Sequence, residues 1–175
     1  RAASSAPEGG WVRAVVGPSV MRDAPASSLA VAAVAGDHPV LLSAWWGHGV
    51  IVTSLGLKTL EIDDKIINAS GGEYERDEAG HLTGKMDEYA GWSALEHLHS
   101  QAGAAATNDA LQAYGSRRLR QGVTSVQIMA GYQEPDRFVS ALDGAALSLR
   151  LRVVAFPLPD APGDGMQHWA DLPFR

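Results

Sequence analysis

A chain of 175 residues, of which 46% are hydrophobic and 19% charged, can form one domain or one domain with a subdomain. Its net charge of −6 and its lack of basic runs argue against nucleic acid as a partner. Cysteine is absent, which excludes disulfides, a thiolate nucleophile and a cysteine-based metal site, and we predict a cytoplasmic location. No apolar run reaches the roughly 18 residues of a membrane span. The first residue is Arg1 rather than methionine, so we interpret the chain as a processed form, a cut chain or an internal fragment.

The N-terminal part predicts one strand and one short helix. Residues 11–16 are rich in strand formers, and Gly17-Pro18 is expected to end that strand. Residues 27–35 predict a helix with a serine cap, and Gly36 stands where a glycine commonly follows a helix. Both elements precede the most informative stretch of the chain.

Residues 38–54, HPVLLSAWWGHGVIVTS, hold the candidate site. Two apolar runs predict strands, and between them two glycines flank His48, which lets the backbone turn sharply and lets a ligand approach. Trp45 and Trp46 add flat apolar surface beside the imidazole, as in a pocket with one polar anchor. We therefore predict that His48, Trp45 and Trp46 bind substrate; a structural histidine in a tight turn is the alternative.

The middle of the chain predicts helices around a hairpin. Thr53-Ser54 can cap a short helix over residues 55–62. Residues 71–84 predict a hairpin in which turn chemistry accounts for every glycine. Residues 87–101 show a helical pattern with Trp92 on its apolar face, and the neighbouring carboxylates Asp87-Glu88 are taken as solvated charges.

The last third of the chain alternates helix and strand, which is typical of parallel strands joined by crossover helices. The expected elements are a helix over 110–121 capped by residues 107–109, a strand over 123–129, a helix over 135–147 and a strand over 149–158. We therefore predict an α/β fold in two domains. Residues 1–103 would form an inserted α+β subdomain containing the hairpin, and residues 104–175 would form the βα units.

Several motifs resemble the amidohydrolase-3 (YtcJ-like) family. D-H-P-V-L-L-S at residues 37–43, followed by G-H-G-V and T-S, is similar to that family's D-H-P-V-L-L … D-G-H-A-A-W-V-N-S. G-G-E-Y-E-R-D-E-A-G-H-L-T-G at 71–84 resembles its G-G-x-I-x-R-D-x-x-G-x-P-T-G hairpin, and G-V-T-S-V at 122–126 resembles G-I-T-S-V. The chain departs from the family at Trp46, where Asp is usual, at Thr53, where Asn is usual, and at Gln127-Ile128, where His-Asp is common.

The resemblance implies a hydrolase of carbon–nitrogen, non-peptide bonds on a TIM barrel, with a divalent metal such as zinc that activates water. A complete barrel has eight strands and about 250 residues, whereas two barrel-type strands are predicted here. We therefore expect a partial TIM barrel that lacks the metal-ligand strands. This chain would bind no metal and be inactive alone, its catalytic residues are unknown, and it would supply substrate-pocket wall in the parent enzyme.

Two further predictions concern metal and partners. His97-Leu98-His99 has the spacing of a metal motif, but on a helix the two imidazoles point about 200° apart, so we assign it no metal. Open strand edges predict that the rest of the barrel, or a second copy in a homo-oligomer, covers the parallel strands. The parent enzyme would bind a small-molecule substrate; the alternative function is a stand-alone, non-catalytic α/β binding or assembly module.

Overall fold

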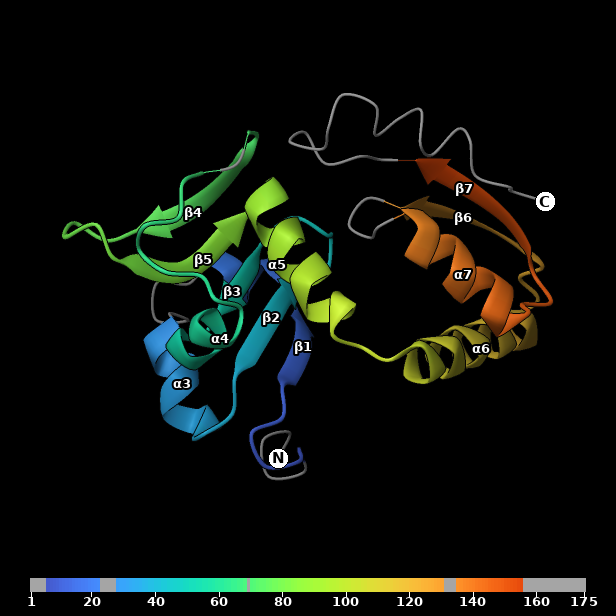
Figure 1. Cartoon of the computed structure of the whole chain (residues 1–175), viewed down its shortest axis with the longest axis horizontal. Coiled ribbons are helices and arrows are strands. Elements are labelled where there is room, and N and C mark those ends of the chain that lie inside the picture. The colour runs from blue at the N-terminus through green and yellow to red at the C-terminus, as the bar shows by residue number, and fades with distance from the viewer. Residues whose placement is uncertain (1–5, 23–27, 69, 131–134, 156–175) are drawn as a thin grey trace. The chain divides into compact units, whose positions relative to one another are not determined.

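The computed structural model describes residues 6–22, 28–68, 70–130 and 135–155 (Figure 1). Over these residues the chain is a mixed α/β protein with parallel and antiparallel strands, which confirms the predicted α/β class. The chain separates into two compact units, Arg1–Ala94 and Leu95–Arg175. The partial TIM barrel and the domain division after residue 103 remain predictions.

Five strands form the sheet of the first unit. In chain order they are β1 (Val12–Val16), β2 (Val40–Ala44), β3 (Val50–Val52), β4 (Gly72–Arg76) and β5 (Leu82–Asp87). They lie in the order β1-β2-β3-β5-β4, with β1 parallel to β2 and the other neighbours antiparallel (Figure 1). The predicted hairpin is therefore confirmed as β4 and β5, and the two apolar runs of the central stretch as β2 and β3.

The core of the first unit is centred on β3. Val50, Ile51 and Val52 are at most 1% exposed. Because successive side chains of a strand point to opposite faces, full burial of three in a row means that both faces of β3 are covered. This buried strand leads away from the turn that carries His48.

Helices of the first unit follow the sequence pattern except at one place. They are α2 (Pro18–Arg22), α3 (Ser28–Ala35), α4 (Ser54–Thr59) and α5 (Glu88–Ser100), the last of which continues into the second unit. The sequence pattern does not predict the helix α2, because Gly17-Pro18 indicates the end of a strand. Proline ends the strand and also suits the first turn of a helix, where its fixed φ is favourable and no backbone N–H is needed.

The second unit contains α6 (Ala104–Arg120), β6 (Ser125–Ala130), α7 (Pro135–Ala145) and β7 (Arg150–Ala155). The strands β6 and β7 pair in parallel from Ser125↔Arg150 onward, with α7 between them in sequence, so the predicted crossover is confirmed (Figure 1). The predicted cap at residues 107–109 is wrong. The helix α6 starts at Ala104 with Gly103 as its cap, because three alanines extend the helix towards the N-terminus.

One face of the β6–β7 sheet is packed. Phe138 of α7 is buried against Ile128, Leu142 and Val153. The alternate positions on the strands include Met129, which is 60% exposed. The part of the predicted last strand beyond residue 155 lies outside the described residues. No helix in the described ranges is both long and apolar enough to cross a bilayer.

Candidate functional site

His48 lies in the connection between β2 and β3, and the two glycines beside it have backbone conformations that favour glycine. Gly47 has φ 85° and Gly49 has φ 105°. The turn is closed by two backbone hydrogen bonds of 3.0 Å, from the Ala44 N–H to the Gly49 carbonyl and from the Gly47 N–H to the Ala44 carbonyl. The predicted sharp turn at Gly-His-Gly is therefore confirmed.

The imidazole of His48 contacts a carboxylate and an indole from the same helix. Its Nδ1 lies 2.7 Å from Oε2 of Glu88, and its ring centroid lies 6.0 Å from that of Trp92. The His48 and Glu88 side chains are 51% and 48% exposed, so the pair is accessible to solvent. Both partners come from α5, forty or more residues away along the chain.

Trp92 also holds the turn itself. Its Nε1–H donates a hydrogen bond of 2.8 Å to the Gly47 carbonyl oxygen, and Tyr89 packs edge-on against it at 5.0 Å. The sequence pattern placed Trp92 on the apolar face of its helix but gave no sign that this face meets the Gly47–His48 turn. The sequence predicts a solvated charge at Glu88, and the carboxylate is half exposed, but it also contacts the His48 imidazole.

Trp45 and Trp46 form a pair of their own. Their rings meet edge-on with centroids 6.2 Å apart, and Trp45 is 67% exposed while Trp46 is half-buried. The indole whose ring lies near the His48 imidazole is that of Trp92, in a tilted arrangement, and the sequence pattern did not place this residue in the site. The proposed binding roles of His48, Trp45 and Trp46 stay predictions.

A further carboxylate adjoins the turn. A Cβ placed on Gly49 would lie 2.9 Å from Oδ1 of Asp87, so the glycine leaves room for this side chain. Partial burial raises the pKa of the Asp87 carboxyl group, and the negative charges of Glu73, Glu75 and Glu88 raise it further. The end of β5 and the start of α5 therefore concentrate negative charge beside the His48 turn.

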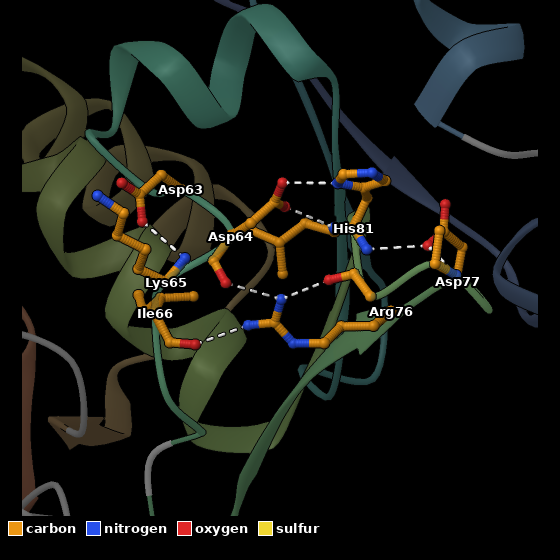
Figure 2. Close-up of polar contacts among 10 residues, drawn as sticks. Asp63, Asp64, Lys65, Ile66, Arg76, Asp77 and His81 are labelled. Atoms are coloured by element: carbon orange, nitrogen blue, oxygen red, sulfur yellow. Dashed lines mark hydrogen bonds and ion pairs between the residues drawn. The ribbon is translucent and has the colours of Figure 1, made fainter.

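A second histidine–carboxylate contact lies at the tip of the hairpin (Figure 2). His81 Nδ1 is 2.8 Å from Oδ2 of Asp64, and the Leu82 N–H donates a 2.9 Å bond to the other oxygen of Asp64. Both bonds lower the pKa of Asp64, the histidine bond most, and the Asp64 bond raises the pKa of His81. Arg76 of β4 donates to the Asp64 and Ile66 carbonyl oxygens, so this network ties a loop to the hairpin.

The remaining predicted positions do not build a metal site in the part of the chain that the structure describes. His97 and His99 lie on α5, as the helical pattern predicted. No group of three or more His, Asp or Glu side chains among the described residues is arranged to hold a metal ion.

Comparison with known proteins identifies the family. The amidohydrolase-3 model, which describes an amidohydrolase family, matches residues 1–173. The chain belongs to this amidohydrolase family. No curated protein and no solved structure matched the chain.

Membership of the amidohydrolase family confirms the resemblance drawn from the residue motifs. It supports a parent enzyme of the hydrolase class, and such hydrolases generally use divalent metals. The motif positions that carry the resemblance lie in the first unit at the His48 turn and the β4–β5 hairpin, and in the second unit at the start of β6.

Proposed function

We propose that this chain is part of a metal-dependent hydrolase that cleaves carbon–nitrogen bonds other than peptide bonds. In this proposal the turn around His48 forms part of the wall of the substrate pocket. The observation that carries the proposal is the family match over residues 1–173. Zinc or a similar divalent ion would be held by residues of the parent enzyme outside this chain, and the chain alone would be inactive. When bound, such a metal makes water a nucleophile at neutral pH.

The geometry of the turn supports a binding role for His48. Half of its side chain is exposed, the flanking glycines add no side-chain bulk, and Trp45 offers an exposed apolar ring nearby in sequence. A polar group surrounded by aromatic surface can orient a small molecule through one hydrogen bond. A hydrogen bond that is made to the substrate throughout the reaction would contribute to kcat/KM rather than supply the chemical step.

The second unit supports a proposal about partners. Its sheet has two strands within the described residues, so each strand has one edge without a partner strand among these residues. Met129 on this sheet is 60% exposed. We infer that strands from the rest of the parent enzyme, or from a second copy, complete this sheet.

Replacing His48 by alanine in the full-length enzyme tests the binding role. We expect kcat/KM to fall roughly tenfold to a hundredfold, which corresponds to about 1.4–2.7 kcal/mol of lost transition-state stabilisation. Metal content and melting temperature should stay close to those of the parent enzyme, because the side chain is half exposed and belongs to no group of three or more possible metal ligands among the described residues.

His81→Ala is the matched control. His81 is also exposed, also bonds a carboxylate through Nδ1 and also lies near a glycine turn, but it is at the hairpin tip rather than in the β2–β3 turn. It should leave kcat/KM unchanged. If His48→Ala unfolds the protein while the folded remainder keeps full specific activity, His48 is a structural turn residue and the binding role is refuted.

A further inference from the structure

We propose that Glu88 is a positioning residue that fixes His48 in the tautomer with its proton on Nδ1, so that Nε2 presents a hydrogen-bond acceptor to an N–H or O–H group of the ligand. The part about the ligand rests on the proposed function of His48. The part about the tautomer stands on the geometry of the described residues alone.

The short contact between the two side chains assigns the proton. Nδ1 of His48 and Oε2 of Glu88 are 2.7 Å apart, the distance of a charge-assisted hydrogen bond. An ionised carboxylate has no proton and can only accept, so Nδ1 must donate. A neutral imidazole has one donor and one acceptor nitrogen, and the proton on Nδ1 therefore leaves a lone pair on Nε2.

The backbone at Glu88 supports a specific role for this residue. Its φ is 51°, in the left-handed region that residues other than glycine rarely adopt. Glu61 and Ala146 share this conformation, but Glu61 follows Leu60, the C-cap of α4, and Ala146 directly follows the end of α7, where a left-handed residue ordinarily terminates a helix. Glu88 instead begins α5, where helix termination gives no reason for it. Such strained residues persist where the surrounding structure fixes them, and they cluster at functional sites.

The helix α5 holds the imidazole and its turn from two points. Glu88 and Trp92 are four residues apart, so they lie on the same face one helical turn apart. Glu88 bonds the His48 ring, while Trp92 packs near that ring and bonds the Gly47 carbonyl. The imidazole is thereby oriented from one side, and half of the side chain stays open to a ligand.

Stabilisation of the fold alone does not explain the contact between His48 and Glu88. Both members of the pair are about half exposed, and an ion pair of this kind contributes little to stability because water screens the charges. The contact does, however, determine which ring nitrogen carries the proton, because that choice depends on a hydrogen bond to the other nitrogen. Fixing the tautomer is therefore the main physical effect of Glu88 on His48.

Nitrogen-15 NMR of the histidine rings tests the tautomer directly in this chain, at a pH where the imidazole is neutral. In the unaltered chain, His48 should give the pattern of an Nδ1–H ring, whereas free histidine favours Nε2–H. In Glu88→Gln, which keeps the side-chain size, the amide can donate as well as accept, and the population should shift towards Nε2–H. In the full-length enzyme the same substitution should lower kcat/KM roughly tenfold.

Glu61→Gln is the control, because Glu61 is an exposed glutamate with a similar left-handed backbone and lies after α4. It should leave the His48 spectrum and kcat/KM unchanged. An Nε2–H ring in the unaltered chain, which requires no variant to fold, overturns the inference, and so does an unchanged spectrum in folded Glu88→Gln. Because the tautomer is measured without substrate, it separates this inference from the proposed function, which fails if His48→Ala keeps full kcat/KM.

Discussion

Gly84 of β5 provides the sharpest test of how the hairpin is joined to the central sheet. This glycine is buried within a strand and has φ 89°. The pairs Val50↔Met86 and Ile51↔Lys85 bring it opposite Val52 of β3. A Cβ at Gly84 would overlap the Val52 carbonyl oxygen and would lie 2.8 Å from the Ser28 Cβ atom. Substitution by alanine must therefore displace backbone and not merely a flexible side chain.

Two costs add at this position. The positive φ costs an L-residue about 1–2 kcal/mol, of which the lower entropy of the unfolded chain offsets up to about 1 kcal/mol. Forcing a methyl group into the packed strand contact costs about 1–3 kcal/mol more. Gly84→Ala should thus reduce the free energy of unfolding by about 3 kcal/mol, a large fraction of the roughly 5–15 kcal/mol of a typical domain.

Gly80→Ala isolates the backbone cost. Gly80 has φ 87°, almost the same as Gly84, but a Cβ there would meet no atom within 4 Å. Gly80→Ala should therefore lower the free energy of unfolding by about 1 kcal/mol or less. The difference between the two variants then measures the steric contact with Val52.

Urea titration followed by tryptophan fluorescence is the appropriate assay, because four of the five tryptophans lie in the first unit. The free energies of unfolding of the two variants should differ by about 2 kcal/mol, while the slope of the free energy against urea concentration stays unchanged. If they lower the free energy of unfolding equally, the close approach of β5 to β3 does not restrict Gly84, and the packing explanation is refuted.

Two further predictions concern side chains of the first unit. Thr53 is 1% exposed, and its hydroxyl oxygen accepts from the N–H groups of Val40 at 3.1 Å and Gly56 at 3.4 Å. Thr53→Val keeps the shape but removes the acceptor of both N–H groups, so urea titration should show that the free energy of unfolding falls by about 2 kcal/mol; Thr53→Ser should lose less, and an equally stable valine variant would contradict this account. For the Asp64–His81 contact, the raised pKa of His81 means that its contribution is present below pH 6.5 and is lost as pH rises through the folded pKa. The lowered pKa of Asp64 means that its contribution is present above pH 3.8 and is lost as pH falls through the folded pKa, so the contact should stabilise the hairpin most between these values. An NMR titration should show the pKa of His81 falling in Asp64→Asn, and an unchanged titration curve would rule out the contact in solution.

Local sequence determined several elements because their causes are local. The Gly-His-Gly turn needs positive φ on both sides of His48, and glycine supplies it at Gly47 and Gly49. The β4–β5 hairpin follows from turn residues between two short strands, and the parallel pair β6–β7 follows from the alternation of helix and strand. Family motifs at these same places identified the amidohydrolase family, which the match over residues 1–173 confirms.

The prediction that turn formation explains every glycine of the hairpin is wrong at Gly84. Turn formation was expected to explain every glycine of the hairpin, but Gly84 lies inside β5, and its close neighbours are Val52 and Ser28 from other elements. Whether a position has space for a side chain depends on the residues that pack against it. At Gly84 these residues come from other elements, so the sequence next to the glycine does not reveal them.

The surroundings of His48 were decided by the tertiary structure for the same reason. The sequence placed two tryptophans beside it, yet the indole near its ring is Trp92 and its hydrogen-bond partner is Glu88, both from a helix that begins 40 residues later. Periodicity can place Trp92 on the apolar face of α5, but it cannot say which turn that face meets. Sequence by itself therefore determined that His48 sits in an accessible turn and to which family the chain belongs, whereas only the packing of α5 against that turn determined which groups orient the imidazole, because such contacts depend on how distant segments meet in the fold.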